Sequence, residues 1–184
     1  SAPVICEKLK PGLGTAVRKM LFDLRSTTPP IGEYGLVHGD FLFSNYLVHN
    51  DGVTVLDFDD LEYGWYAYDI AVNLYYDVLG GDPLQAMYRG EYAQVLLSEL
   101  LQGYLRHVRI PVSSLAMIEK LMRQREIGLL TSIVKRSCPD ALSGWAADFV
   151  KTSIPRIEAG VPIVKIRYTE AYEIALEANQ SILR

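Results

Sequence analysis

Runs of basic residues and long apolar segments are missing from this sequence. Its 184 residues include 18 Lys and Arg against 22 Asp and Glu, which gives a net charge of -4, and the basic residues form no run. This balance argues against nucleic acid or an anionic membrane as the main partner, and a neutral or cationic small molecule fits better. No stretch reaches the roughly 18 apolar residues that a membrane-spanning helix needs.

Cysteine is also scarce. Cys6 and Cys138 are far apart and match no metal-binding or redox spacing, so we expect two ordinary thiols and no disulfide framework. The N-terminus lacks the charged segment and apolar core of an export signal. These features together predict a cytoplasmic protein that is not associated with a membrane.

What the sequence does contain is enough apolar material for a sizeable core, because 49% of its residues are hydrophobic. Apolar residues at helical spacing predict helices at 13–25, 68–79, 84–106, 114–136, 141–152 and from Tyr168 to the C-terminus. Glycine and proline interrupt these segments at 80–83, 110–111, 138–140 and 160–162.

Short β-branched and aromatic runs predict strands at 35–38, 46–49 and 53–57. The turn signal Asn50-Asp51-Gly52 joins the last two into a hairpin. We therefore expect a mostly helical α+β fold with one small β hairpin near its start. Residues 1–34 would form a helix and linker, 35–66 the β unit and 67–184 the helical part of one lobe.

The β unit carries the residues that suggest a chemistry. Asp40 and Asn45 are separated by four residues in a loop between two predicted strands, and Asp57 ends the second hairpin strand. Phosphoryl transfer from a nucleotide needs a carboxylate that orients the acceptor and oxygen ligands that hold magnesium on the phosphates. The spacing lets Asp40 face an acceptor hydroxyl while Asn45 and Asp57 turn toward Mg²⁺. We interpret His38 as a support of this loop.

Three linked motifs carry a resemblance to a known family. They are His-Gly-Asp-x-x-x-x-Asn at 38–45, Leu-Asp-Phe-Asp-Asp at 56–60 and Gly-Trp-Tyr-Ala-Tyr-Asp at 64–69. In this order they resemble the aminoglycoside phosphotransferase and choline kinase family, whose members are relatives of protein kinases. The resemblance implies the C-terminal lobe of a protein-kinase-like fold, with ATP as phosphate donor and Mg²⁺ as its ion.

The resemblance also implies roles for individual residues. Asp40 would be the catalytic base, and Asn45 and Asp57 the magnesium ligands. Asp69 would tie down the backbone of the catalytic loop, beside His38. These residues together would serve transfer of the γ-phosphate of ATP to a hydroxyl of a small molecule.

Other side chains near these motifs allow two interpretations. Asp59, Asp60 and Glu62 form an acidic run that is either a solvated loop or a site for a cationic or amine-bearing acceptor. Most of the nearby aromatic residues are expected in the core rather than against a ligand; they are Trp65, Tyr66, Tyr68, Tyr75 and Tyr76. Farther along the chain, we expect an ion-paired helix surface at Arg123, Arg125 and Glu126.

The nucleotide lobe that the resemblance implies has no place in this sequence. It comprises a five-stranded sheet with a phosphate-covering loop and a lysine, for which on the order of 65 residues are needed. Only 37 residues precede His38. We expect a C-terminal lobe without its nucleotide lobe, as a truncated product, an excised fragment or a lobe completed by another polypeptide.

A lobe of this kind would keep Leu47 and Leu56, which the resemblance places beneath the adenine. It would be weak or inactive alone, because most of the stabilisation of the phosphates would be lost. Its exposed lobe interface would favour self-association or binding of the missing lobe.

The leading hypothesis is therefore a magnesium- and ATP-dependent kinase of small molecules. The alternative is a non-catalytic binding module that keeps the acceptor pocket or a docking face without nucleotide turnover. A metal-dependent hydrolase ranks third, because it would leave Asn45 and Asp69 without a role.

Overall fold

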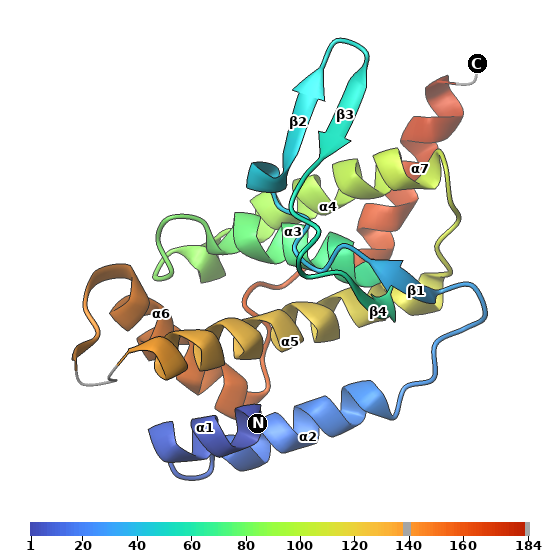
Figure 1. The fold of residues 1–184 in the computed structure, drawn as a ribbon. Helices are drawn as coiled ribbons and strands as arrows, with labels where there is room; N and C mark the ends of the chain where they lie inside the picture. The colour runs from blue at the N-terminus through green and yellow to red at the C-terminus, as the bar shows by residue number, and fades with distance from the viewer. Residues whose placement is uncertain (138–140, 183–184) are drawn as a thin grey trace.

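Helix α5 (Val112–Arg136) runs through the middle of the structure, and most other helices pack against it (Figure 1). A computed structural model describes residues 1–137 and 141–182 of the chain. The helices in contact with α5 are α1 (Ala2–Leu9), α2 (Leu13–Arg25), α3 (Ala67–Leu79), α6 (Gly144–Ala159) and α7 (Tyr168–Ile182). Helix α4 (Gly90–Leu105) packs on α3 and α7. The expected mostly helical α+β fold is confirmed.

The strands form two antiparallel pairs rather than the single hairpin that we expected. Strands β2 (Tyr46–His49) and β3 (Gly52–Val55) form that hairpin, which projects from the helices (Figure 1). Strand β1 (Tyr34–Val37) pairs with β4 (Glu62–Trp65), which the sequence did not reveal. Strand β4 is only four residues long and contains a glycine, so its pattern is too short and too weak to predict a strand. This second pair holds the two ends of the candidate catalytic segment together.

The predicted helices match the structure in place but not always in length. Helix α2 has the predicted bounds, whereas the helix predicted at 84–106 is a short 3₁₀ turn, η2 (Ala86–Tyr88), followed by α4. The helix predicted at 141–152 begins at Gly144 and continues through Pro155 to Ala159, where Gly160 ends it in the left-handed conformation. The interruption predicted at 138–140, and with it Cys138, lies outside the described residues.

Helix α1 was missed, because its eight residues are too few to show a clear period. Its Glu7 carboxylate accepts hydrogen bonds from the backbone N–H groups of Gly12 and Gly14, both at 3.0 Å. These donors belong to the first turn of α2, which has no partner for them within the helix. Glu7 thereby joins α1 to α2.

The core is built largely from α3, which is buried on most of its sides, together with α4 and α5. Tyr75 and Leu74 of α3 are fully buried, as are Leu97 of α4 and Leu130 of α5. Trp65 and Tyr68 are buried as well, so the expectation that most of these aromatics pack in the core is confirmed. No helix in the described part of the chain is long and apolar enough to cross a membrane.

The ion-paired helix surface predicted at Arg123, Arg125 and Glu126 is wrong: Arg125 and Glu126 pair with residues of other elements, and the salt bridges of the described residues do not include Arg123. Glu126 is 1% exposed, and its carboxylate accepts hydrogen bonds from Arg156 of α6 at 2.6 and 3.0 Å. Burial raises the pKa of the Glu126 carboxyl, and the Arg156 guanidinium opposes this rise. The pair links α5 to α6 inside the protein. The Arg125 side chain is mostly buried and pairs with Asp40 of the loop after β1.

Removing the cation of this buried pair should destabilise the fold. We expect Arg156→Met to lower the free energy of unfolding at pH 7 by about 3–5 kcal/mol, because Glu126 then remains buried without a counter-charge. The loss should be smallest below the ordinary carboxyl pKa of 4.5 and should grow as pH rises through the raised pKa of the folded protein. Denaturant unfolding at several pH values measures this difference from the wild type.

Two control variants separate this effect from the loss of any ion pair. The double variant Glu126→Met/Arg156→Met should recover most of the stability, since no charge is left buried. Lys10→Met removes the exposed pair between Lys10 and Glu158 and should cost at most about 1 kcal/mol. A loss for Arg156→Met no larger than for Lys10→Met would contradict the prediction.

Candidate active site

The loop that follows β1 is fastened to the start of α3 by one carboxylate. Asp69 lies in the first turn of α3 and accepts the backbone N–H of His38 on Oδ2 at 3.0 Å and that of Gly39 on Oδ1 at 2.9 Å. Asn73, one turn later, donates from Nδ2 to the carbonyl of Phe41 at 3.2 Å. Hydrogen bonds from backbone N–H groups to a carboxylate are among the stronger ones in proteins. The loop therefore has a defined position on α3.

His38 connects the loop to the segment after the hairpin. Its Nδ1 accepts the backbone N–H of Asp40 at 3.3 Å, so the proton is on Nε2, which donates to the carbonyl of Leu56 at 2.9 Å. The ring also lies 5.0 Å from the ring of Phe58, measured between centroids. Both ring nitrogens are occupied, and the side chain is 7% exposed. This geometry suits a support of the loop.

Asp40 and Asn45 lie side by side. The Asn45 amide donates from Nδ2 to the backbone carbonyl of Asp40 at 2.8 Å and to its carboxylate Oδ2 at 3.2 Å. The amide oxygen of Asn45 accepts the hydroxyl of Ser44 at 3.1 Å and keeps a second lone pair. Asn45 is buried, whereas the Asp40 side chain keeps 23% of its surface exposed. The structure thus brings together a carboxylate open to a ligand and an amide oxygen next to it.

Asp57 lies two residues beyond the end of β3, not at the end of the strand as predicted. The backbone N–H of Leu56 donates to the carbonyl of Asn45 at 2.8 Å, which brings the two segments together. In the described part of the chain, Asp57 is the only residue other than glycine with a positive φ, 60°. A carboxylate held in this uncommon conformation is frequently a functional one.

The donor set fits a magnesium ion that is shared with a nucleotide. The Asn45 amide oxygen and the Asp57 carboxylate are hard oxygen ligands, and Mg²⁺ is usually bound by one or two such groups together with phosphates and water. No cluster of three His, Cys, Asp or Glu side chains able to hold a metal by itself occurs within residues 1–137 and 141–182. A metal at this position would therefore need ligands beyond the side chains.

Arg125 is the residue that sequence reasoning missed at this site. It lies in the middle of α5, and its Nη2 donates to Asp40 Oδ1 in a charge-assisted hydrogen bond. Its Nε donates to the hydroxyl of Tyr76 at 3.2 Å, and the guanidinium lies over the Tyr76 ring, 5.1 Å from the centroid. Burial would lower the pKa of Arg125, but Tyr76, Tyr68 and Asp40 outweigh it and raise the pKa, so the cation is permanent.

The only hint in the sequence was its spacing from Arg123. Two residues apart on a helix, Arg123 and Arg125 cannot lie on the same face, so they could not both belong to one paired surface. Nothing in the sequence indicates which of the two turns inward.

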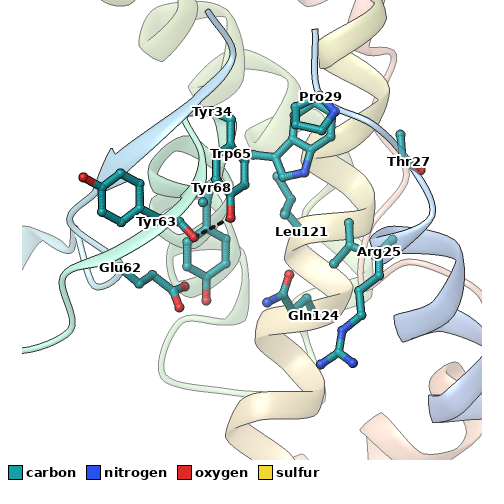
Figure 2. A pocket seen from close by; sticks show the side chains of 12 residues that line it. Arg25, Thr27, Pro29, Tyr34, Glu62, Tyr63, Trp65, Tyr68, Leu121 and Gln124 are labelled. Atoms are coloured by element: carbon teal, nitrogen blue, oxygen red, sulfur yellow. Dashed lines mark hydrogen bonds between the residues drawn. The ribbon is translucent and has the colours of Figure 1, made fainter. Parts of the chain in front are cut away.

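A cavity of about 330 Å³ opens beside Gly39 and Arg125, the neighbours of Asp40 in sequence and in ion pairing, although Asp40 itself does not line it. Its wall includes Gly39 of the loop, Asp60 and Glu62 of the acidic run, and Tyr68 and Arg125. A neighbouring cavity of about 400 Å³ shares Glu62, Tyr68 and Gln124 with it (Figure 2). In that cavity, Trp65 of β4 lies next to Leu121 of α5 (Figure 2). Two of the three acidic residues proposed for acceptor binding thus line a cavity that Gly39 and Arg125 also line.

The other residues predicted to bind the acceptor or the nucleotide do not line either of these two cavities. Asp59 is exposed. Leu47 of β2 and Leu56 are 50% and 38% exposed. They lie on the hairpin and just after it, with Val48, Val53 and Phe58 also exposed there. This is an apolar surface at the side of the site where the resemblance expects adenine.

Comparison with known proteins assigns the chain to a class. Residues 7–107 match the model of the APH family, described as the phosphotransferase enzyme family. Because this match spans more than half of the chain, the chain belongs to that family. The resemblance seen in the motifs is therefore confirmed.

Among individual relatives, amicoumacin kinase of Bacillus subtilis (strain 168) is 25% identical over 158 residues, which cover 82% of this chain and 44% of the relative. A solved structure of an amicoumacin kinase in complex with AMP-PNP, Ca²⁺ and Ami has a TM-score of 0.75 and 21% identity, and the match covers 86% of this chain and 47% of that one. This second likeness concerns the fold alone. The chain spans about half the length of the relatives it matches.

The contact between the loop and the acidic segment yields a prediction about Gly39. Gly39 has φ 80°, and a Cβ placed on it would lie 2.3 Å from the carbonyl oxygen of Asp60. We expect Gly39→Ala to push these segments apart and to lower the melting temperature by several degrees, because neither backbone can yield cheaply. Thermal unfolding followed by circular dichroism measures the change.

Gly32→Ala is the matched control. Gly32 has a similar φ of 85°, but a Cβ there would meet nothing within 4 Å. This variant should show only the cost of a left-handed alanine, roughly 1 kcal/mol. Equal losses for the two variants would show that the contact with Asp60 is unimportant.

Proposed function

We propose that this chain is the acceptor- and metal-binding part of an APH-type phosphotransferase that transfers the γ-phosphate of ATP to a hydroxyl of a small, amine-bearing molecule. The observation that carries the proposal is the loop itself: Asp69 fastens its backbone, Asn45 lies beside Asp40, and a cavity opens at Gly39. Membership of the phosphotransferase family supports it.

In this proposal Asp40 orients the acceptor hydroxyl and accepts its proton. Transfer of a phosphoryl group passes through a loose transition state, so the position of the attacking oxygen matters more than the strength of the base. The hydrogen bonds from Asn45 and Arg125 hold one oxygen each of the Asp40 carboxylate. Each oxygen keeps a lone pair for the hydroxyl proton.

Asn45 and Asp57 would hold Mg²⁺, and His38 and Asp69 would keep the loop in place. When bound there, the ion would supply charge neutralisation to the phosphates. Asn45 suits this role, because its Nδ2 is turned to Asp40 and its amide oxygen, which accepts the Ser44 hydroxyl, keeps a second lone pair for a cation. Asp57 has no hydrogen bond among those found for the described side chains, so its carboxylate remains available.

The acceptor would occupy the cavity beside Gly39, with Asp60 and Glu62 attracting its amine. Asp59 was proposed with them but lies outside this cavity. Amicoumacin is the first acceptor to test, since both relatives are amicoumacin kinases.

The adenine would lie on Leu47 and Leu56. Their exposure, together with that of the neighbouring apolar side chains of the hairpin, supports an interface that a nucleotide and a second lobe would cover. We further propose that residues 1–184 act as one lobe, in which 1–34, 35–66 and 67–184 are the linker, site and helical parts. The two-stranded sheets of the described residues contain nothing like the five-stranded sheet of a nucleotide lobe. Transfer would then need that lobe from elsewhere.

Replacing Asp40, the proposed base, tests whether the chain acts as a phosphotransferase. We expect Asp40→Asn to lower phosphate transfer from magnesium-ATP to amicoumacin by at least 100-fold, because the amide cannot accept the hydroxyl proton. Transfer should be measured with the 184-residue chain alone and with the chain supplied with the nucleotide lobe of a relative.

Asp23→Asn is the control, because it removes the same charge from an exposed position on α2. It should leave transfer unchanged. If neither preparation of the wild type transfers phosphate to any amine-bearing alcohol, the enzyme proposal is wrong.

A non-catalytic binding module is the second candidate. It is favoured by one observation: a cavity with acidic residues on its wall is present beside Gly39. The two candidates differ in their dependence on Asp57. Acceptor binding that needs no ATP and is unaffected by Asp57→Ala, without any magnesium-nucleotide binding, would support the module.

A phosphotransferase site should instead bind magnesium-ATP, and the ligand should raise the melting temperature of the chain. Asp57→Ala should abolish this increase. Asp59→Ala, which removes a neighbouring exposed carboxylate, should preserve it. A similar increase in both variants would exclude Asp57 as a metal ligand.

A further inference from the structure

Arg125 is held rigidly at a place where a phosphotransferase acceptor would have to bind. Tyr76 of α3 engages it twice, through its ring at 5.1 Å and its hydroxyl at 3.2 Å, and only 19% of the Arg125 side chain is exposed. Its Nη2 donates to Asp40, and the residue lines the cavity together with Tyr68. A guanidinium stacked and hydrogen-bonded in this way keeps one orientation.

The cavity beside it has charges of opposite sign on different parts of its wall. Among the described residues that line it, Arg125 is the only basic one, and the acidic ones are Asp60 and Glu62. Asp60 and Glu62 are exposed, and Arg125 is mostly buried. An ammonium group entering this cavity is therefore attracted at one part of its wall and repelled at another.

We propose that Arg125 is a positioning and specificity-determining residue, which holds the Asp40 carboxylate and keeps an acceptor's ammonium away from Asp40, on the side of Asp60 and Glu62. This inference rests on the proposed function of the site and deepens it. Arg125 would thereby select acceptors in which the reacting hydroxyl lies several bonds away from the amine. An ammonium directly beside the hydroxyl would have to approach the fixed guanidinium.

The orientation of Asp40 follows from the same contact. Asn45 and Arg125 hold its two oxygens from opposite elements of the fold, the loop and α5. Without Arg125, the carboxylate would keep only the bond from Asn45 and could turn toward any cation in the cavity. A small cationic ligand would then replace the guanidinium.

Binding of ethanolamine tests this directly, because its ammonium is two carbons from its hydroxyl. Binding to the 184-residue chain is followed by the NMR shifts of the Gly39 and Asp60 amides. We expect Arg125→Met to bind ethanolamine roughly fivefold to tenfold more tightly than the wild type, as one repelling charge is removed from a partly exposed site. Ethylene glycol, which has no charge, should bind equally to both.

Two variants control for charge and for folding. Arg125→Lys keeps the charge and should leave the affinity for ethanolamine close to that of the wild type. Lys135→Met removes a positive charge from an exposed position on the same helix, about 15 Å away along its axis, and should also have little effect. Thermal unfolding of each variant verifies that it is folded.

Unchanged, weaker or undetectable binding of ethanolamine to folded Arg125→Met would overturn the inference. The same holds if Lys135→Met reproduces the gain. If Arg125→Met is not folded, Arg125→Lys decides: a gain in affinity despite the retained charge would also overturn it, and an unchanged affinity would support it.

This test needs no phosphate transfer, so its failure is distinct from failure of the proposed function. Where transfer is measurable, Arg125→Met should lower kcat while the KM for ATP stays unchanged, because Asp40 loses its orientation. Arg125→Lys should recover part of the loss. If Arg125 had a purely structural role, kcat of both variants would fall in proportion to their loss of stability.

Discussion

The site depends on the two hydrogen bonds that the Asp69 carboxylate accepts from the backbone of His38 and Gly39. They fix the start of the loop to the first turn of α3, and every other contact builds on that position. His38 can then link Asp40 to Leu56, and Asn45 can lie against Asp40. One carboxylate thus sets the distance between the loop, the hairpin and the helix that supports both.

Helix α5 contributes a second constraint, because adjacent residues on it face different partners. Glu126 is buried against Arg156 of α6, whereas Arg125 reaches Asp40 across Tyr76 of α3. Helical geometry turns consecutive side chains by about 100°, so one helix can serve the core and the site at the same point. The same helix thus carries one group of the α5–α6 packing and one group that holds the Asp40 carboxylate.

Several parts of the fold were predictable because their signal is local. The bounds of α2 follow from its apolar spacing and the prolines after it, and the β2–β3 hairpin follows from Asn50-Asp51-Gly52. Strand β4 was not predictable, because four residues carry little pattern and the strand exists through pairing with β1, nearly thirty residues earlier. The buried Glu126 was misjudged for a similar reason, since its partner Arg156 lies on another helix.

The sequence by itself determined the class of protein and the order of its candidate site residues, because these residues are close along the chain and belong to short motifs. Only the tertiary structure decided what surrounds Asp40. Arg125 is 85 residues away from it, and the two meet because α3 and α5 pack together. Motifs record the groups that act within one loop. Whether a positive charge such as that of Arg125 lies against the loop depends on which face of α5 turns inward, and the packing of the helices sets this.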